Sequence, residues 1–296
     1  MGLKTSELSP LLAPGRYVLA VSGGVDSVVL LNMAVRQASL STAGAYELVV
    51  AHFDHGIRAD SAQDVTFVTE LAKKYGLSFE SQREELGANA SEALARTRRY
   101  GFLRTVAKRH TASLVTAHHA DDAVETIAIN LIRGTGWRGL AVLDSDIIRP
   151  LLDLSKQEIL AYASKYQLAW REDSTNASDD YLRNRLRRKT EVLTDDDKRQ
   201  LLGLRVQQVA LKQQIDKEVQ GLIGKGPDYS RYFFTHLDTV TAIECLRNGT
   251  HARLTRPQLI KAFLAIKTAR PGAVYQAGDG LQFLFTSRNF KVELIK

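Results

Sequence analysis

Short apolar runs alternate with longer segments whose apolar residues recur at helical spacing over the first 130 residues. The apolar runs, rich in β-branched residues, predict buried strands at 17–21, 46–52, 77–81 and 113–117. The segments between them predict helices at 25–38, 61–75, 90–109 and 120–132. Regular alternation of strand and helix predicts an α/β fold, a Rossmann-like parallel sheet with helices on both faces.

The pattern changes near residue 150. Ser155 followed by Glu158 is a capping-box spacing and predicts a helix over 155–166. A long helix with a basic and glutamine-rich face is expected over 195–222. The remaining expected elements are a linker at 224–230, a helix at 256–268 and short strands at 281–286 and 290–295.

Composition narrows the class of protein. Hydrophobic residues make up 44% of the 296 residues, which supports a sizeable core. No apolar run approaches the roughly 18 residues that a membrane span requires, and no signal-peptide layout begins the chain. The one cysteine, Cys245, excludes an intrachain disulfide, a cysteine-rich zinc site and an iron–sulfur cluster, and it is expected to be buried. These features favour a cytoplasmic protein without a membrane partner.

The formal net charge of +7 favours a polyanionic partner, RNA or DNA, although a generally basic surface has the same total. The charge is concentrated in Tyr181–Thr190, which has five basic residues and no acid. A helix there would spread Arg183, Arg187 and Arg188 over adjacent faces, suited to an RNA backbone. The alternative is a solvated basic helix.

The segment Ser22–Ser27, SGGVDS, lies between a predicted strand and a predicted helix. Gly23 and Gly24 let the backbone approach a ligand, and the unpaired amides of a helix start attract phosphate. Ser22 and Ser27 offer hydroxyls to phosphate oxygens. Asp26 would repel a bare phosphate, so it is expected beside Mg²⁺ or an electrophile. The spacing is not that of a Walker motif, and the alternative is a tight turn with a helix cap.

Three polar segments, 22–27, 53–58 and 118–122, each follow a predicted strand and are therefore expected to face one cleft. Asp122 and Glu125 share a helix face and suit a cationic ligand, or the deprotonation of an attacking amine. The alternative is an acidic helix start favoured by the dipole. For His118 and His119 a metal site is disfavoured because no third ligand has suitable spacing, so they are expected to line the cleft.

The phosphate-loop segment resembles that of the N-type ATP pyrophosphatases (the PP-loop family), which cleave ATP between its α- and β-phosphates and adenylate a substrate. Four further segments resemble the tRNA(Ile)-lysidine synthetase family, and with the loop they cover residues 16–190. They are His52–Asp64, Thr116–Leu143, Ile148–Ile159 and Trp170–Arg187.

The resemblance implies a ligase that uses ATP and Mg²⁺. It implies adenylation of the wobble cytidine of an isoleucine tRNA with a CAU anticodon, and then displacement of AMP by free L-lysine to form lysidine. It implies catalytic roles for Asp26, Asp122 and Glu125. It implies ATP binding by Ser22, Gly23, Gly24, Val25, Asp26, Ser27 and Asp54, with Mg²⁺ on Asp26. Asp54 is flanked by His52 and His55, and its target is the adenosine or the base to be modified.

The resemblance further implies lysine binding by Asp122, Glu125, Asp173 and Arg183, although Asp173 has an equal alternative as a turn residue. It implies tRNA binding by Arg133, Arg138, Arg185, Arg187 and Arg188. Arg133 and Arg138 flank two glycines, so a helix end with a glycine cap is the alternative there. Arg183 or Arg185 has the alternative of stabilising phosphate or the lysine carboxylate.

Residues beyond about 200 resemble the family only weakly, as a long helix leading to a small α+β unit that helps to hold tRNA. We therefore expect a PP-loop catalytic domain at 1–190, a helical linker region at 191–226 and a small C-terminal tRNA-binding domain at 227–296. A second C-terminal domain of longer members is expected to be absent, and a homodimer follows from the resemblance alone. A sulfur-inserting tRNA enzyme is disfavoured because it needs a cysteine pair, and an amidotransferase-type synthetase because no glutaminase nucleophile is evident. A silent RNA-binding protein is disfavoured by the intact acidic residues.

Overall fold

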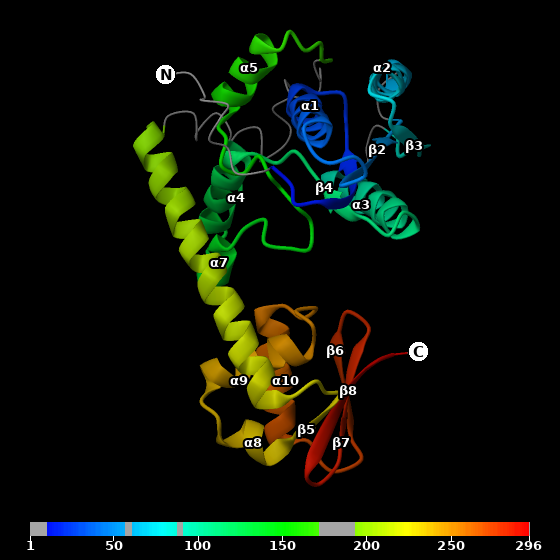
Figure 1. Cartoon of the computed structure of the whole chain (residues 1–296). Helices are drawn as coiled ribbons and strands as arrows, with labels where there is room; N and C mark the ends of the chain where they lie inside the picture. The colour runs from blue at the N-terminus through cyan, green and yellow to red at the C-terminus, as the bar shows by residue number, and fades with distance from the viewer. Residues whose placement is uncertain (1–10, 57–60, 88–90, 172–192, 296) are drawn as a thin grey trace. The chain divides into compact units, whose positions relative to one another are not determined.

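The computed structural model describes residues 11–56, 61–87, 91–171 and 193–295. The chain divides into two compact units, Met1–Val206 and Gln207–Lys296 (Figure 1). Within the described ranges, no helix combines the length and the hydropathy needed to cross a bilayer.

The first unit is built on a four-stranded parallel sheet with the strand order β3-β2-β1-β4. Its strands are β1 (Gly15–Ala20), β2 (Tyr46–Asp54), β3 (Ser78–Arg83) and β4 (Ser113–Val115). Central β1 pairs Val18 with Val49 of β2 on one side and with Leu114 of β4 on the other. The predicted parallel sheet is confirmed, and each strand boundary lies within two residues of its predicted position.

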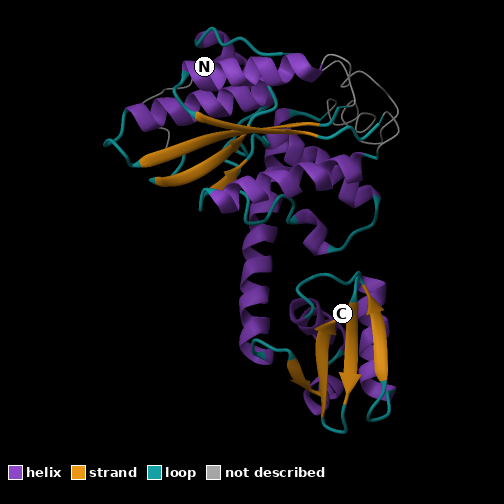
Figure 2. Ribbon diagram, turned by 90° about the vertical axis from the view of Figure 1, so that its right-hand side faces the viewer, coloured by secondary structure: helices purple, strands orange, loops and turns teal. Residues whose placement is uncertain are grey.

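Helices cover both faces of this sheet, as Figure 2 shows with the strands seen edge-on. The helices are α1 (Val25–Ser39), α2 (Ser61–Lys74), α3 (Glu92–Arg109), α4 (Ala120–Ile132) and α5 (Lys156–Lys165), with a short 3₁₀ helix, η1 (Trp137–Leu140). Alternate strand residues point to opposite faces. Leu19 and Leu48 therefore join a core with α1, α2 and α5, whereas Val18 and Val49 pack against α3.

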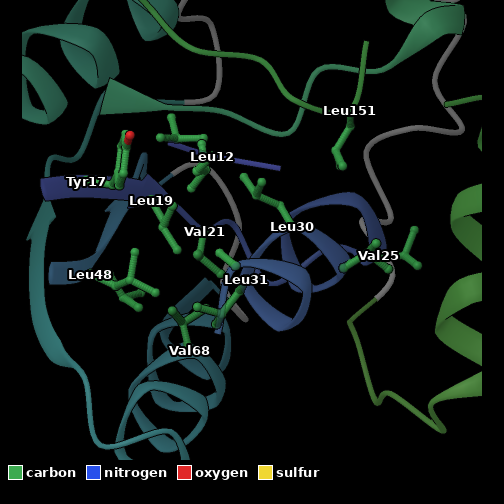
Figure 3. Close-up of a cluster of buried hydrophobic side chains, with 14 of the residues drawn as sticks. Leu12, Tyr17, Leu19, Val21, Val25, Leu30, Leu31, Leu48, Val68 and Leu151 are labelled. Carbon is green, nitrogen blue, oxygen red and sulfur yellow. The ribbon is translucent and has the colours of Figure 1, made fainter. Parts of the chain in front are cut away.

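The core on the α1 side lies directly under the predicted phosphate loop. Leu19 and Val21 lie beside Leu31 of α1 and Val68 of α2, and all four are buried (Figure 3). Burying an aliphatic side chain of this size contributes about 1.5–3 kcal/mol relative to leaving it exposed. This packing fixes where β1 ends and α1 begins, and so it fixes the loop between them.

Helix α5 has the cap that its sequence predicts. The Ser155 hydroxyl accepts a hydrogen bond from the Glu158 amide at 3.2 Å, and the Glu158 carboxylate accepts one from the Ser155 amide at 2.8 Å. Both orphan amides at the start of the helix are thereby satisfied. The helix consequently begins at Lys156, a residue whose side chain reaches the candidate site.

The second unit contains a four-stranded antiparallel sheet with the order β5-β8-β7-β6. Its elements are β5 (Asp228–Ser230), α8 (Arg231–His236), α9 (Thr239–Gly249), α10 (Arg256–Thr268), β6 (Val274–Gly278), β7 (Leu281–Phe285) and β8 (Asn289–Leu294). Phe234, Phe283 and Phe290 are fully buried in its core, and Cys245 is buried as expected. The expected α+β unit is therefore present, with β5, β6, α8 and α9 in addition to the predicted elements.

The long helix predicted at 195–222 is α7, Asp195–Ile223, and it belongs in part to each unit. Its first half is anchored in the first unit, where Arg205 donates to the Val142 carbonyl at 2.9 Å. Near its end, Val219 is buried in the core of the second unit. The domain limits expected at 190 and 226 stay predictions, and the first of them lies outside the described residues.

Candidate active site

The segment Ser22–Ser27 forms a tight loop organised by one hydroxyl. The Ser27 Oγ accepts hydrogen bonds from the amides of Ser22 and Gly23, both at 3.2 Å, and donates to the Gly24 carbonyl at 2.8 Å. Gly23 has a φ of +96°, which glycine adopts without strain. Ser22 is exposed, but its hydroxyl also belongs to this network: its Oγ lies 3.2 Å from the Ser27 Oγ and accepts from the Gly24 amide at 3.4 Å. Ser27 is buried and shapes the loop.

Two segments far away in the sequence hold the loop in place. His52, at the end of β2, is buried, and its Nδ1 lies 2.8 Å from the Val21 carbonyl oxygen. The Arg171 amide donates to the Gly23 carbonyl at 3.0 Å. The Arg171 guanidinium also pairs with Asp64 in the first turn of α2. The loop is thus clamped between β2 and the chain that follows α5.

Replacing Ser27 with alanine should lower the free energy of unfolding of the first unit by about 1–3 kcal/mol, because two amides and a carbonyl lose their buried partner. Urea denaturation checks the result. Ser39→Ala removes an exposed hydroxyl at the other end of α1 and is the matched control. Equal losses for the two variants would contradict the organising role of Ser27.

A cavity of about 440 Å³ opens at the carboxyl ends of β1, β2 and β4. The three polar segments expected to share a cleft all contribute to it. Its polar lining residues are Ser22, Asp26, Ser27, His52, Asp54, His55, Ser61, Asp64, Arg96, Arg99, Tyr100, Thr116, His118 and Asp122. The expected common cleft is therefore present, at the place where ligands bind in open α/β sheets.

At the phosphate-loop end of this cavity, acidic side chains surround a buried histidine. The His119 Nε2 lies 3.9 Å from Asp26 Oδ1 and 3.6 Å from Asp122 Oδ2. The Lys156 ammonium from α5 forms an ion pair with Asp26. The structure thus brings the loop carboxylate, the start of α4 and a lysine from α5 within a few ångströms of one another, and the local sequence pattern did not indicate Lys156.

Asp121, beside Asp122 on α4, has a different role. One of its carboxylate oxygens accepts from the Lys156 amide at 2.8 Å, and the other pairs with Lys198 Nζ at 2.8 Å. The contact with His119 and these two partners lower its pKa well below the ordinary range. Asp121 therefore ties α4 to α5 and to α7, whereas Asp122 lines the cavity.

The other predicted acids are placed differently. Glu125 is 5% exposed and lies one helical turn after Asp122, within α4, and it is not among the residues that line the cavity. Asp54 does line the cavity, but its carboxylate accepts from the Gly56 amide at 2.9 Å and the Ser61 hydroxyl at 3.1 Å, and pairs with Arg83 at 3.2 Å. Asp54 is thus held from within the protein, which fits a role in shaping the pocket wall.

The two adjacent histidines have pKa values shifted in opposite directions. Burial is the main cause that lowers the pKa of His118 to about 4, and nearby guanidinium groups, among them Arg149, add to it. Burial also acts to lower the pKa of His119, but Asp121, Asp122 and Asp26 more than offset it, so the pKa of His119 is raised. At neutral pH, His118 is therefore neutral, whereas the raised pKa of His119 lets that ring keep its proton to a higher pH than a free imidazole.

The two histidines should affect stability in different pH windows. The unfolded chain protonates His118 near its ordinary pKa of about 6.5, whereas the folded chain protonates it near a pKa of about 4. Stability is consequently lost as pH falls from about 6.5 towards 4, by at most about 1.4 kcal/mol for each pH unit crossed. The contribution of His119 has the opposite sign, being present at low pH and lost as pH rises through its raised pKa.

NMR titration of the imidazole resonances checks this prediction, with His118→Gln and His119→Gln variants to assign them. We expect one resonance to titrate far below about 6.5 and the other above it. His118→Gln should also flatten the loss of stability between about pH 6.5 and 4 in urea denaturation. Two resonances that titrate together would contradict the electrostatic description of the site.

Two predicted arginines lie in the loop after α4. Arg133 is the helix C-cap, and Gly134 follows with a φ of +66°, so the backbone has the glycine-capped helix end. Arg133 is exposed, and the Arg138 guanidinium lies 4.7 Å from the Trp137 ring centroid. The remaining predicted residues, Asp173, Arg183, Arg185, Arg187 and Arg188, lie outside the described residues.

Sequence reasoning missed the arginines on α3. Arg96 and Arg99 line the cavity together with Tyr100. Their spacing of three residues puts them on one face of a helix, and that spacing was the available signal. It could not show that this face turns towards the cavity, because the orientation of α3 depends on packing of Leu103 and Val106 against the sheet.

Asp26 is suited to hold a metal ion only when the phosphates of a bound substrate supply further ligands to the metal. Among the described residues no group of three or more histidine, cysteine or acidic side chains could hold a metal ion. Mg²⁺ is commonly held by one or two carboxylates while substrate phosphates and water complete its octahedron. One carboxylate in the first turn of α1, beside the phosphate loop, fits that arrangement.

Curated relatives match the first unit. A tRNA(Ile)-lysidine synthase of Geobacter sulfurreducens is 41% identical over 191 residues, which cover 60% of this chain and 40% of that protein. One of Bacillus cereus strain ATCC 10987 is 41% identical over 187 residues, covering 58% of this chain and 38% of that protein. The match thus spans about two fifths of the relatives' own length.

A solved structure shares the fold. The U34-tRNA thiolase NcsA from Methanococcus maripaludis, solved with its [4Fe-4S] cluster, aligns with a TM-score of 0.58 at 18% identity, over 68% of this chain and 73% of that one. At that identity the likeness concerns the fold alone. The sequence also matches the PP-loop domain over residues 4–193, a range that holds the glycine loop, the cavity and the acidic start of α4. The chain therefore belongs to the PP-loop domain family.

Proposed function

We propose that this protein is a tRNA(Ile)-lysidine synthetase. It ligates L-lysine to the wobble cytidine of an isoleucine tRNA with a CAU anticodon, through an adenylated tRNA, and releases AMP and pyrophosphate. The curated relatives carry that name and match the unit that contains the cavity. The proposal includes a cytoplasmic location, because that is where the proposed substrates occur. It also includes a homodimer, on the basis of family resemblance.

The observation that carries the proposal is the convergence of Asp26 and Asp122 on one cavity. They come from the phosphate loop and from α4, and His119 lies within 3.9 Å of both. A reaction that transfers AMP and then attaches an amine needs the phosphate and the amine side by side. One cavity with a phosphate loop and an acidic wall provides both.

The phosphate-loop end is suited to bind the triphosphate of ATP. The amides at the start of α1 carry the positive end of the helix dipole, and the exposed Ser22 lies beside them. Asp26 would hold Mg²⁺, which neutralises charge on the phosphates when bound. We assign to Lys156, which pairs with Asp26, a contact with a phosphate oxygen.

The acidic wall is suited to bind the lysine amine. Asp122 lines the cavity and has 24% of its side chain exposed, so a carboxylate oxygen remains accessible to an ammonium. The attacking amine must be neutral, and a carboxylate can take up its proton. Glu125 is assigned with Asp122 to this step, and its burial within α4 favours a supporting part in it.

Sulfur insertion into tRNA, the nearest rival activity, finds little support in the described chain. The one cysteine, Cys245, is fully buried in the second unit. Burial raises the pKa of its thiol to about 11, which keeps the reactive thiolate scarce. Persulfide or cluster chemistry would require accessible thiolates.

The test is incorporation of radiolabelled lysine into unmodified isoleucine tRNA with a CAU anticodon, with and without ATP and Mg²⁺. We expect incorporation that depends on ATP and fails with methionine tRNA, which shares the anticodon sequence. If RNA-dependent ATP–pyrophosphate exchange occurs without lysine incorporation, the protein transfers AMP and the lysine assignment is wrong. If neither occurs, the proposed ligase is wrong.

A further inference from the structure

The cavity has a basic end, formed by α3 on the opposite face of the sheet from α1. Arg96, Arg99 and Tyr100 all line it. The Arg96 and Arg99 guanidinium groups lie 4.8 Å and 5.4 Å from the Tyr100 ring centroid. The ring therefore keeps both guanidinium groups close to each other at one end of the cavity.

Several guanidinium groups gather at this end of the cavity, and the Arg96 and Arg99 charges both act on the neighbouring His118. Two nearby carboxylates that line the cavity, Asp54 and Asp64, are paired with Arg83 and Arg171. Across the described part of the chain, Arg96 forms no ion pair with a carboxylate. The Arg149 guanidinium is close enough to add to the field at His118. A cluster of guanidinium groups next to a low-dielectric wall attracts an anion.

One buried polar atom beside these arginines, the His55 Nδ1, lacks a hydrogen-bond partner among the described residues. The Tyr100 hydroxyl and the Arg149 guanidinium are close enough to interact with each other. Leaving a buried polar atom unsatisfied costs about 1–3 kcal/mol, so an unpartnered His55 nitrogen at a cavity wall needs a reason. A polar ligand that enters from the cavity can satisfy His55, which lines it.

The triphosphate of ATP does not need this end of the cavity. The phosphate loop, Asp26 and Lys156 belong to the other face of the sheet, where α1 and α5 pack. Arg96 and Arg99 belong to α3, which packs on the opposite face. Two separate groups of donors at one cavity suit a reaction that joins two phosphate-bearing substrates.

We propose that Arg96 and Arg99 form a second anion-binding subsite, which takes a backbone phosphate of the substrate RNA next to the base that is modified. Arginine is the side chain best shaped for this ligand, because its planar fork binds a phosphate through two parallel hydrogen bonds. The identity of the ligand as RNA rests on the proposed function, whereas the anion subsite rests on the cavity and its arginines.

The test compares Arg96→Ala with wild type in two separate binding measurements. Filter binding of an anticodon stem–loop RNA with a CAU loop, over a series of salt concentrations, measures the RNA contact. We expect affinity to fall about tenfold and the slope of log K against log salt to decrease by about one. Calorimetric binding of Mg²⁺ with a non-hydrolysable ATP analogue should be unchanged.

Arg98→Ala is the matched control, since Arg98 lies on the same helix, pairs with Glu84 at 3.4 Å and does not line the cavity. Arg96→Lys keeps the charge but loses the forked geometry, so it should bind RNA with intermediate affinity. Arg96→Lys also keeps the proposal testable if the alanine variant folds poorly.

Three outcomes would overturn the subsite. They are weaker binding of the ATP analogue with unchanged RNA affinity, equal losses for Arg96→Ala and Arg98→Ala, and full RNA affinity in Arg96→Ala. Failure of the proposed function is a separate result. A wild-type protein that incorporates no lysine but shows the Arg96-dependent RNA contact keeps the subsite and loses only the lysine reaction.

Discussion

Replacing Asp26 with asparagine should lower RNA-dependent ATP–pyrophosphate exchange about 10³-fold while RNA affinity stays unchanged. The carboxylate is the one acidic group in the phosphate loop, and it pairs with Lys156 from α5. Asparagine has nearly the same shape but no charge, so it binds neither a metal ion nor an ammonium strongly. Exchange of labelled pyrophosphate into ATP and filter binding of RNA measure the two quantities.

Asp146→Asn is the matched control for this substitution. Asp146 is exposed, pairs with Arg104 and does not line the cavity, so both exchange and RNA binding should stay as in wild type. Normal exchange in Asp26→Asn, or a loss confined to RNA binding, would contradict the role given to the loop carboxylate. Because Lys156 loses its partner, a modest loss of stability is also expected.

Asp122→Asn should raise the KM for lysine about 10- to 100-fold while RNA-dependent ATP–pyrophosphate exchange continues. Removing one charged partner of an ammonium costs about 1.5–3 kcal/mol, which corresponds to that range. The asparagine oxygen can still accept the His119 amide that Asp122 caps at 3.0 Å, so α4 should begin where it does now. Lysine incorporation measured over a range of lysine concentrations gives the KM.

The neighbouring Asp121→Asn provides the contrast. Asp121 belongs to the same helical turn, but its carboxylate is taken by the Lys156 amide and by Lys198, and it does not line the cavity. Its replacement should lower stability, because Lys198 is left without its carboxylate, and should leave the lysine KM unchanged. Equal effects on KM from both substitutions would mean that the acidic wall acts only through general electrostatics.

The parts of the fold that could be predicted are those that depend on residues close together in the sequence. The apolar run of β1 followed by SGGVDS indicates a strand, a phosphate loop and a helix within a short window. The capping box formed by Ser155 and Glu158 predicts where α5 begins, and the structure confirms both of its hydrogen bonds. Such features depend on backbone geometry and neighbouring side chains, so the surrounding fold alters them little.

The parts that could not be predicted depend on contacts between distant residues. Lys156 and Asp26 are 130 positions apart, and no local pattern couples them. Arg96 and Arg99 were part of an expected helix, but only packing against the sheet turns their face towards the cavity. In the second unit, β5 has three residues and α8 has six, too few for a periodic pattern to develop.

The clamped phosphate loop has a consequence for engineering. Its shape depends on His52, which holds the Val21 carbonyl, and on the Arg171 amide, which holds the Gly23 carbonyl. These partners come from segments about 30 and 150 positions further along the chain. Grafting the six residues SGGVDS onto another strand–helix junction would therefore transfer the sequence of the loop but not its backbone conformation. A working transplant would have to include the end of β2 and the stretch after α5.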